Sequence, residues 1–477
     1  MRPIPLISAG VALAVYGLTL HPSLPGGDAG ELASAACSGG VAHPPGYPLH
    51  GLLLRLIDLV PLGTHFQRFN ALSALCAALT VGLLVHLVTS WTSRPTAGLV
   101  AGAAWLMSPL AWRYATSLEV FSLHTALLAL FGVALTRDLQ RASPFAPSGV
   151  EALPLIGAAT SSEPGSESRR PLDSARGERY RRPPPGQPAR GDRVGRSPVG
   201  QEARSATSGS TGLMLGLSAG LALTHHPTAL FVMGPLLALR AAKHPARGRL
   251  GLGLLLGALP LLLLPYWSAN DTPFSWGELR TVDGFLTHVL RREYGTFQLA
   301  AGGAEGLGLP AFLRHFAAFE LHQLRGLVAL LALAGLAAVW RSGKARSWLL
   351  VTCASFALSL LVFGALANLP LDDALFRGVV ARFFLMPHLL LCAAVPLALG
   401  RRAWLGLLPL VALGLLERPR PDGLSVRAYG EVLLDQPADA LVLAQGDLIS
   451  GAMRALQACD AVHPGLQVVD QQLLTWP

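Results

Sequence analysis

The stretch IPLISAGVALAVYGLTL, residues 4–20, is an apolar run that ends just before the polar loop Gly26-Gly27-Asp28-Ala29-Gly30-Glu31. About 17–25 apolar residues cross a bilayer as a helix. Few charges precede the run and no small-x-small cleavage site follows it, so it predicts an uncleaved membrane span rather than a signal peptide. Asp28 and Glu31 therefore lie where the chain leaves the membrane. Ionisable groups at such a place are costly and usually serve a function.

The composition extends this prediction to the whole chain. Of 477 residues, 52% are hydrophobic and only 14% are charged, which is too apolar for one soluble domain and typical of a multi-pass membrane protein. A net charge of +9 would suggest nucleic acid as a partner of a soluble protein. Here the excess arginines lie in one linker and in short turns between apolar runs, as the positive-inside rule requires, so we expect no nucleic-acid partner.

We predict about eleven transmembrane helices, near residues 4–20, 69–89, 96–111, 119–136, 212–224, 227–240, 249–267, 326–340, 347–366, 383–400 and 403–416. With the amino terminus inside, every inner connection is basic, which places the first polar loop and the chain's last segment outside the cytoplasm. We expect the bacterial inner membrane. The sequence His225-His226-Pro227 interrupts one apolar region, either as the turn between two tilted spans or as the tip of a re-entrant hairpin.

Composition also divides the chain. Residues 1–140 and 212–416 form two transmembrane regions, and residues 141–211 form a cytoplasmic insert rich in Arg, Pro, Gly and Ser. Such an insert cannot bury enough apolar surface to offset chain entropy, so we expect disorder. Residues 417–477 form a tail whose apolar stretches at 440–444 and 466–469 read as short strands. The predicted fold class is all-α polytopic, with a small extracytoplasmic α/β tail.

The five cysteines predict neither a definite disulfide nor a metal site. Cys37 and Cys459 both fall on the outer side of this topology, and whether they pair stays open. The other three cysteines lie in apolar spans and read as small buried hydrophobes. Because no cysteine or histidine cluster has metal-ligand spacing, we predict no metal site.

Asp28 and Glu31 allow two interpretations. Asp-x-x-Glu before an alanine-rich run is a capping box, with the helix ending at Gly39 or Gly40. The same pair, on one helix face, could be a general base and its partner. The following His43-Pro44-Pro45-Gly46-Tyr47-Pro48 is a rigid turn. It either brings His43 and Tyr47 back toward the first loop or is a corner into the amphipathic stretch 49–60, whose Arg55 and Asp58 would face water.

Other polar residues at outer ends of spans allow the same two kinds of interpretation. Glu119 opens the fourth span, where the helix dipole favours a carboxylate. His225 and His226 either hydrogen-bond to backbone freed at Pro227 or contact a ligand. Arg382 either snorkels to the interface or binds a phosphate with its planar donor fork.

Together these segments resemble a large bacterial family of membrane proteins of unknown function, allied to the eukaryotic transmembrane protein O-mannosyltransferases within the GT-C glycosyltransferase superfamily. The resemblance rests on residues 27–31 (with Ala29 where the family favours serine), Val41 to Pro48, Asn70 to Leu75, Glu119 to His124, His225-His226, Trp276-Gly277-Glu278, Arg291 to Gly295, Arg382-Phe383-Phe384 and Gln445-Gly446-Asp447. It spans nearly the whole chain apart from the insert.

The resemblance implies a glycosyltransferase that uses a polyprenyl-phosphate sugar donor, with mannose as one candidate sugar, and a protein or envelope-glycan acceptor outside the cytoplasm. It implies inversion with Asp28 as general base and Glu31 orienting the acceptor or supporting the base. The lipid phosphate would be held by Arg382, His225 and His226, and next by Arg291 and Arg292. The substrate site would be lined by His43, Tyr47 and Glu119. No cofactor or metal is expected. The alternatives are a transporter or flippase of lipid-linked sugars, although no repeat is evident, and a non-catalytic scaffold.

Overall fold

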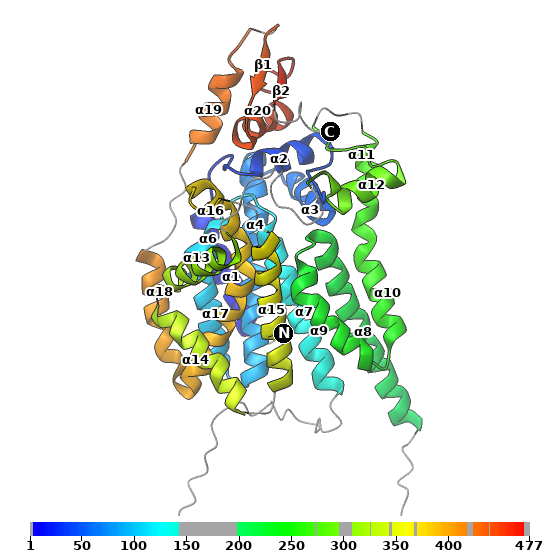
Figure 1. Ribbon diagram of the computed structural model, residues 1–477, viewed down its shortest axis with the longest axis vertical. Helices are drawn as coiled ribbons and strands as arrows, with labels where there is room; N and C mark the ends of the chain where they lie inside the picture. Colours follow the sequence, from blue (N-terminus) through cyan, green and yellow to red (C-terminus); the bar gives the residue numbers. More distant parts are fainter. Residues whose placement is uncertain are drawn as a thin grey trace, which may run out of the picture.

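The structure is a computed structural model, which describes residues 3–142, 198–270, 272, 274–294, 308–324, 326–342, 346–366, 370–416, 423–437 and 439–471. It is mostly helical, as predicted. Figure 1 shows three levels along the long axis: a bundle of long helices, a layer of short helices at one end, and the small tail beyond that layer.

The bundle is made of mostly apolar helices of different lengths. In chain order its elements are α1 (Pro3–Leu18), α4 (His65–Thr92), α5 (Pro95–Leu106), α7 (Phe121–Ala142), α8 (Pro198–His225), α9 (Ala229–Lys243), α10 (Arg247–Ala258), η1 (Leu259–Leu262), α14 (Leu327–Ser342), α15 (Arg346–Leu366), α17 (Leu385–Leu399), η4 (Gly400–Gly406) and α18 (Leu407–Leu416). The largest fully buried side chains include Trp105, Trp112, Phe66, Phe69 and Phe384. They come from α4, α5, α6 (Pro109–Ala115) and η3 (Arg382–Phe384), so the core lies where these elements meet.

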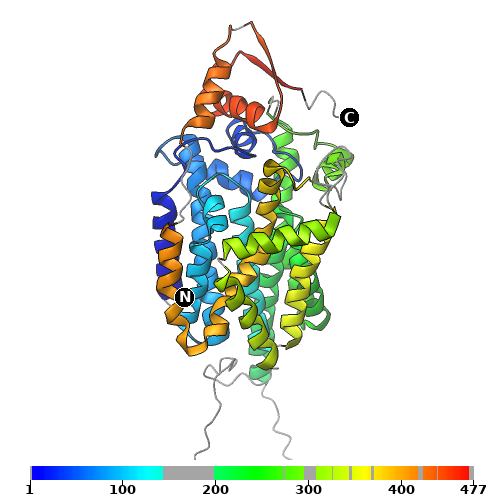
Figure 2. The same ribbon diagram turned by 60° about the vertical axis from the view of Figure 1, so that its left-hand side comes forward.

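Three helical stretches of the described chain are long and apolar enough to cross a membrane: His65–Thr92, Arg247–Ser268 and Phe376–Leu416. A fourth candidate is the pair Gly308–Gln323 and Leu327–Arg341, which meet at 107°. Helix α13 (Gly308–Gln323) accordingly lies across the bundle rather than along it (Figure 2). The chain is a multi-pass membrane protein. The number eleven stays a prediction, because several expected spans are short helices, such as α5 with 12 residues.

The described residues bear on two expectations for the middle of the chain. His225 ends α8 and α9 begins at Ala229, so the double histidine separates two helices, as both a turn between spans and a re-entrant hairpin require. Helix α8 starts at Pro198, so the prediction of disorder is wrong for residues 198–211. Pro198 suits the first turn of a helix, and the residues after it include no further proline to stop the helix. The remainder of the insert, residues 143–197, lies outside the described residues.

The layer of short helices covers one end of the bundle. Its elements are α2 (Ala29–Ser38), α3 (Pro48–Asp58), α6 (Pro109–Ala115), α11 (Leu263–Ser268), α12 (Val282–Val289), η2 (Arg292–Tyr294), α16 (Ala374–Ala381) and η3 (Arg382–Phe384). Helix α3 is the amphipathic stretch, and Leu56 on it is 52% exposed. The expectation that Arg55 and Asp58 face water is wrong. Arg55 lies 3.7 Å over the ring of Trp267 and donates to two backbone carbonyls, while Asp58 pairs with His65 and Arg68.

The tail confirms the predicted α/β unit. Strands β1 (Leu441–Ala444) and β2 (Gln467–Asp470) are parallel, with Leu441 opposite Gln467 and Ala444 opposite Asp470. Helix α20 (Asp447–Asp460) connects them, and α19 (Ser425–Leu434) packs beside it. Parallel strands need such a crossover.

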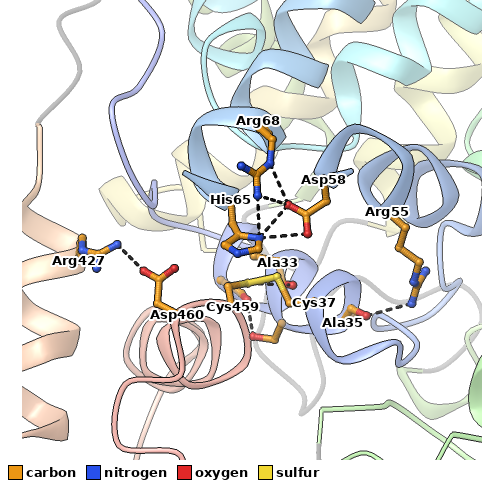
Figure 3. Close-up of a disulfide and its surroundings, with 12 residues drawn as sticks. Ala33, Ala35, Cys37, Arg55, Asp58, His65, Arg68, Arg427, Cys459 and Asp460 are labelled. Atoms are coloured by element: carbon orange, nitrogen blue, oxygen red, sulfur yellow. Dashed lines mark hydrogen bonds and ion pairs between the residues drawn. A yellow bond between two sulfur atoms is a disulfide. The ribbon is translucent and has the colours of Figure 1, made fainter. Parts of the chain in front are cut away.

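Helix α20 packs directly on α2, so the tail is fastened to the layer beneath it. Cys37 and Cys459 form a disulfide that joins the two helices (Figure 3). At the other end of α2, the backbones meet at Gly30 and Gly451: a Cβ atom at Gly30 would lie 2.4 Å from the Gly451 carbonyl carbon. Only glycine fits at position 30, whereas a Cβ atom at Gly451 would meet its nearest neighbour at 3.5 Å.

We expect Gly30→Ala to destabilise the docked tail, because the added methyl group must push two backbones apart. Overpacking of this kind costs about 1–3 kcal/mol. Gly10→Ala in α1 is the matched control, since a Cβ atom there meets nothing within 4 Å. Thermal unfolding in detergent measures both. Equal midpoints for the two variants would show that the crossing tolerates a side chain.

Candidate active site

Asp28 lies at the start of α2, at the centre of the candidate site. It is the N-cap residue, and Gly39 ends the helix in a left-handed conformation (φ 79°). The helix is therefore confirmed, but the capping box is wrong, because the Asp28 side chain makes no capping hydrogen bond. Its carboxylate instead accepts a hydrogen bond of 2.5 Å from Arg382 Nη1. A side chain that could have capped its own helix is directed to a residue 354 positions away.

Arg382 joins two carboxylates that come from different loops. Its Nη1 atom contacts Asp28 Oδ2 and lies 4.0 Å from Glu119 Oε1. All three side chains are at least three-quarters buried, with exposed fractions of 14% for Arg382, 24% for Asp28 and 10% for Glu119. Burial alone would raise the pKa of Asp28, but the Arg382 guanidinium and the His43 imidazole lower it below its usual value. Asp28 is therefore an ionised carboxylate at neutral pH.

Buried Asn70 on α4 brings the loops of Asp28 and Glu119 together. Its amide nitrogen donates to the carbonyls of His21 and Ser23, and its amide oxygen accepts from the Leu118 N–H at 2.7 Å. One amide thus satisfies backbone groups of the segments before α2 and before α7, as buried polar groups require. Asn70 belongs to a segment that carries the family resemblance.

Glu31, His43 and Tyr47 form a second group beside Asp28. Glu31 accepts hydrogen bonds of 2.5 Å from the backbone N–H and from Nδ1 of His43. The other ring nitrogen of His43 lies 3.2 Å from the Tyr47 hydroxyl. The proline-rich turn therefore folds back onto α2. Glu31 fixes the orientation of His43 and, through it, that of Tyr47.

The backbone of this turn takes conformations that few residues adopt. Gly46 has φ 87°, and a Cβ atom there would lie 2.7 Å from Leu264 Cδ2. Tyr47 has φ 43°, in the left-handed region where a bulky residue costs of order 1–3 kcal/mol. The surrounding contacts hold Tyr47 in this conformation, and such strain is concentrated at functional sites.

The Glu31–His43 pair makes stability depend on pH. Burial lowers the pKa of His43, but Glu31 outweighs it and raises that pKa to about 9. Because the folded pKa lies above the unfolded value of about 6.5, the pair's contribution is complete below pH 6.5 and is lost as pH rises through 9. We expect the thermal midpoint to fall across this window. In Glu31→Gln the fall should be much smaller, and an equal fall in that variant would contradict the assignment.

Histidines and aromatic side chains form the wall of the site toward the bundle. The His225 and His226 rings both lie 6.0 Å from the Tyr47 ring, and His226 is stacked on it. His225 Nε2 hydrogen-bonds the Val120 carbonyl, and His226 Nδ1 contacts the Thr228 hydroxyl. His226 makes the predicted hydrogen bond to backbone near Pro227, because its Nδ1 accepts from the Thr228 N–H at 3.3 Å. His225 instead bonds a carbonyl of another segment. Both rings border Tyr47. The same wall includes Phe121, Phe383 and His124, whose rings contact His226.

The structure brings most of the predicted site residues together. Asp28, Glu31, His43, Tyr47, Glu119, His225, His226 and Arg382 are connected by the contacts above. Arg291 is close enough for its charge to act on His43 and Tyr47. Arg292 is not part of the group: its side chain is 46% exposed and pairs with Asp283. His124 and Phe383 were not predicted individually, because a ring in an apolar helix has no local signal of its contacts.

Comparison with known proteins agrees with the motifs. Residues 28–144 match the family model described as the N-terminal domain of protein O-mannosyl-transferase TMEM260. The protein O-mannosyl-transferase TMEM260 of Mus musculus is 28% identical over 501 residues, which cover 98% of this chain and 62% of that protein. The chain is similar to the transmembrane protein O-mannosyltransferases. The resemblance predicted from the sequence is confirmed.

A second curated relative and a solved structure are also similar to this chain. The protein O-mannosyl-transferase of Dictyostelium discoideum is 25% identical, over 97% of this chain and 56% of its own length. The chain thus spans about 60% of the length of these curated relatives. A solved structure of ArnT from Cupriavidus metallidurans bound to undecaprenyl phosphate is 14% identical over 98% of this chain and 90% of ArnT, with a TM-score of 0.45.

Proposed function

We propose that this protein is a membrane glycosyltransferase of the GT-C type. It transfers a sugar, with mannose as first candidate, from a polyprenyl-phosphate donor to a hydroxyl of a protein or envelope acceptor. The observation that carries the proposal is the Asp28 carboxylate, ionised and held by Arg382 at the end of the bundle. The names of the curated relatives, protein O-mannosyl-transferase, support the reaction and the class of acceptor.

In the proposed reaction the acceptor hydroxyl attacks the anomeric carbon of the donor. Asp28 accepts the hydroxyl proton as the new carbon–oxygen bond forms, and the configuration is inverted. The bond from the anomeric carbon to the phosphate oxygen breaks, and its electron pair leaves with the polyprenyl phosphate. The donor is already activated by its phosphate. The proposed step is therefore written with the lipid-linked donor, the acceptor hydroxyl and side chains of this protein.

Arg382 is the proposed partner of the leaving phosphate. A guanidinium has five N–H donors, and the bonds to Asp28 and to the Val379 carbonyl use two of them. Preorganised cationic donors stabilise the charge that develops on a leaving group. His225, His226 and Arg291 are proposed to line the phosphate side, while Glu31 and His43 hold the acceptor side in place.

We further propose that the site faces the outside of the bacterial inner membrane. The Cys37–Cys459 disulfide supports this orientation, because disulfides persist in oxidising compartments. The basic turns of the predicted topology support the same orientation.

The test is an assay of the purified protein in vesicles with labelled polyprenyl-phosphate sugars and a serine- or threonine-containing peptide. A transferase consumes the donor and labels the peptide. A flippase relocates the labelled lipid without consuming it, and that result would replace the proposal by the transporter alternative.

A further inference from the structure

The first turn of α20 lies over the start of α2, next to the site. Leu448 Cδ1 would be 3.3 Å from a Cβ atom at Gly26, and Gly451 meets Gly30. Asp447 is the first residue of α20 and belongs to neither the Asp28 group nor the Glu31 group. The tail therefore presents a carboxylate above the residues that flank Asp28.

The position of Asp447 is fixed by the tail's own fold. Gly446 has φ 96° and ψ 145°, a conformation almost restricted to glycine, and it turns the chain from β1 directly into α20. Ser450 on the same turn donates to Asp470 at the end of β2, at 2.7 Å. At the far end of α20, Cys459 is bonded to Cys37 and Asp460 pairs with Arg427 (Figure 3). Asp447 thus sits on an element that is anchored at both ends.

The charges around Asp447 are mainly negative. Partial desolvation against α2, then the charges of Asp28, Glu31 and Asp470, raise the pKa of Asp447, and His43 opposes them. The packing of α20 on α2 places Asp447 near the site, and the influence of Asp28 and Glu31 on its pKa agrees with this position. Its side chain remains exposed to solvent.

This arrangement separates two kinds of charge. Arg382, proposed to meet the lipid phosphate, lies on the bundle side of Asp28 in η3. Asp447 lies on the tail side, where its carboxylate would repel a phosphate. The acceptor, arriving from solvent, is therefore the substrate that meets Asp447. Complementary charge selects partners and rejects like-charged ones.

We propose that Asp447 is a specificity-determining residue that favours polypeptide acceptors with a lysine or arginine next to the hydroxyl that receives the sugar. The inference rests on the proposed function and names its acceptor class. It gives the tail a role in choosing substrates in addition to its packing on α2.

The test compares two peptides that differ only in a Lys or a Glu beside one threonine. The wild-type protein should show about tenfold higher kcat/KM for the Lys peptide, as expected for one partly screened ion pair. Asp447→Asn should raise KM for the Lys peptide more than it lowers kcat, and Asp447→Lys should reverse the preference. Asp435→Asn, which removes another exposed carboxylate of the tail, should leave the preference unchanged.

The outcomes separate the two proposals. A wild-type protein that labels both peptides equally, or an Asp447→Lys variant that keeps the Lys preference, overturns the inference and leaves the transferase assignment standing. A wild-type protein that labels no acceptor overturns the proposed function and with it the inference. Retention of the Cys37–Cys459 disulfide in each variant, measured by thiol labelling, shows that the tail is still docked.

Discussion

Asp28→Asn is expected to lower the rate of sugar transfer by a factor of about 10²–10⁴, the usual contribution of a general base. Asparagine has nearly the shape of aspartate but does not accept the acceptor's proton at neutral pH. The native carboxylate is available to accept it, because Arg382 and His43 offset the effect of burial on its pKa and keep Asp28 ionised. The measurement is the initial rate of peptide labelling from a polyprenyl-phosphate sugar in vesicles.

The fold of the Asp28→Asn variant should persist. Arg382 remains 4.0 Å from Glu119, so its charge keeps a partner when Asp28 is neutralised. Asp435→Asn, an exposed carboxylate at the end of α19, is the matched control and should transfer at the wild-type rate. Normal transfer by a well-folded Asp28→Asn protein would remove Asp28 from the role of base.

Sequence patterns predicted the parts of the fold that depend on neighbouring residues, such as helix ends and short strands. Helix α2 ends at Gly39 because glycine takes the left-handed conformation there easily. The tail strands follow from two short apolar stretches with turn residues between them. The start of α8 and the direction of Arg55 were missed for different reasons. A helix can extend into a polar segment when nothing stops it, and Arg55 turns inward because Trp267, more than 200 positions later, offers its ring face.

The sequence predicted most of the residues that gather at the candidate site, but not which of them contact one another. The motifs identified Asp28, Glu31, His43 and Arg382, yet nothing in their spacing shows that Asp28 binds Arg382 rather than its own helix end. The contact of Gly30 with Gly451 has no sequence signal either, because small residues at a helix crossing look like ordinary alanine- and glycine-rich helix. The position of Asp447 over the start of α2 follows from that contact, so no local pattern predicts it.

Arg382→Gln is expected to reduce both stability and transfer, for separable reasons. Removing one partner of a largely buried ion pair leaves Asp28 and Glu119 without their cation, at a cost of up to about 3–5 kcal/mol. Losing a preorganised donor at the leaving phosphate should lower the transfer rate by about 10²–10³. Thermal midpoints and initial rates, measured on the same preparation and normalised to folded protein, report the two effects.

The double variant Asp28→Asn/Arg382→Gln separates structure from chemistry. With both partners neutral, much of the stability lost in Arg382→Gln should return, since no unpaired charge remains at Asp28. Transfer should stay absent, because neither base nor phosphate donor is present. Arg382→Lys keeps the charge but loses the planar fork, and should raise KM for the lipid donor more than for the peptide. If Arg382→Gln transferred sugar at the wild-type rate per folded molecule, Arg382 would be only the structural partner of Asp28. The leaving phosphate would then need another cation. Arg291 would be the next candidate, because its charge acts on His43 and Tyr47.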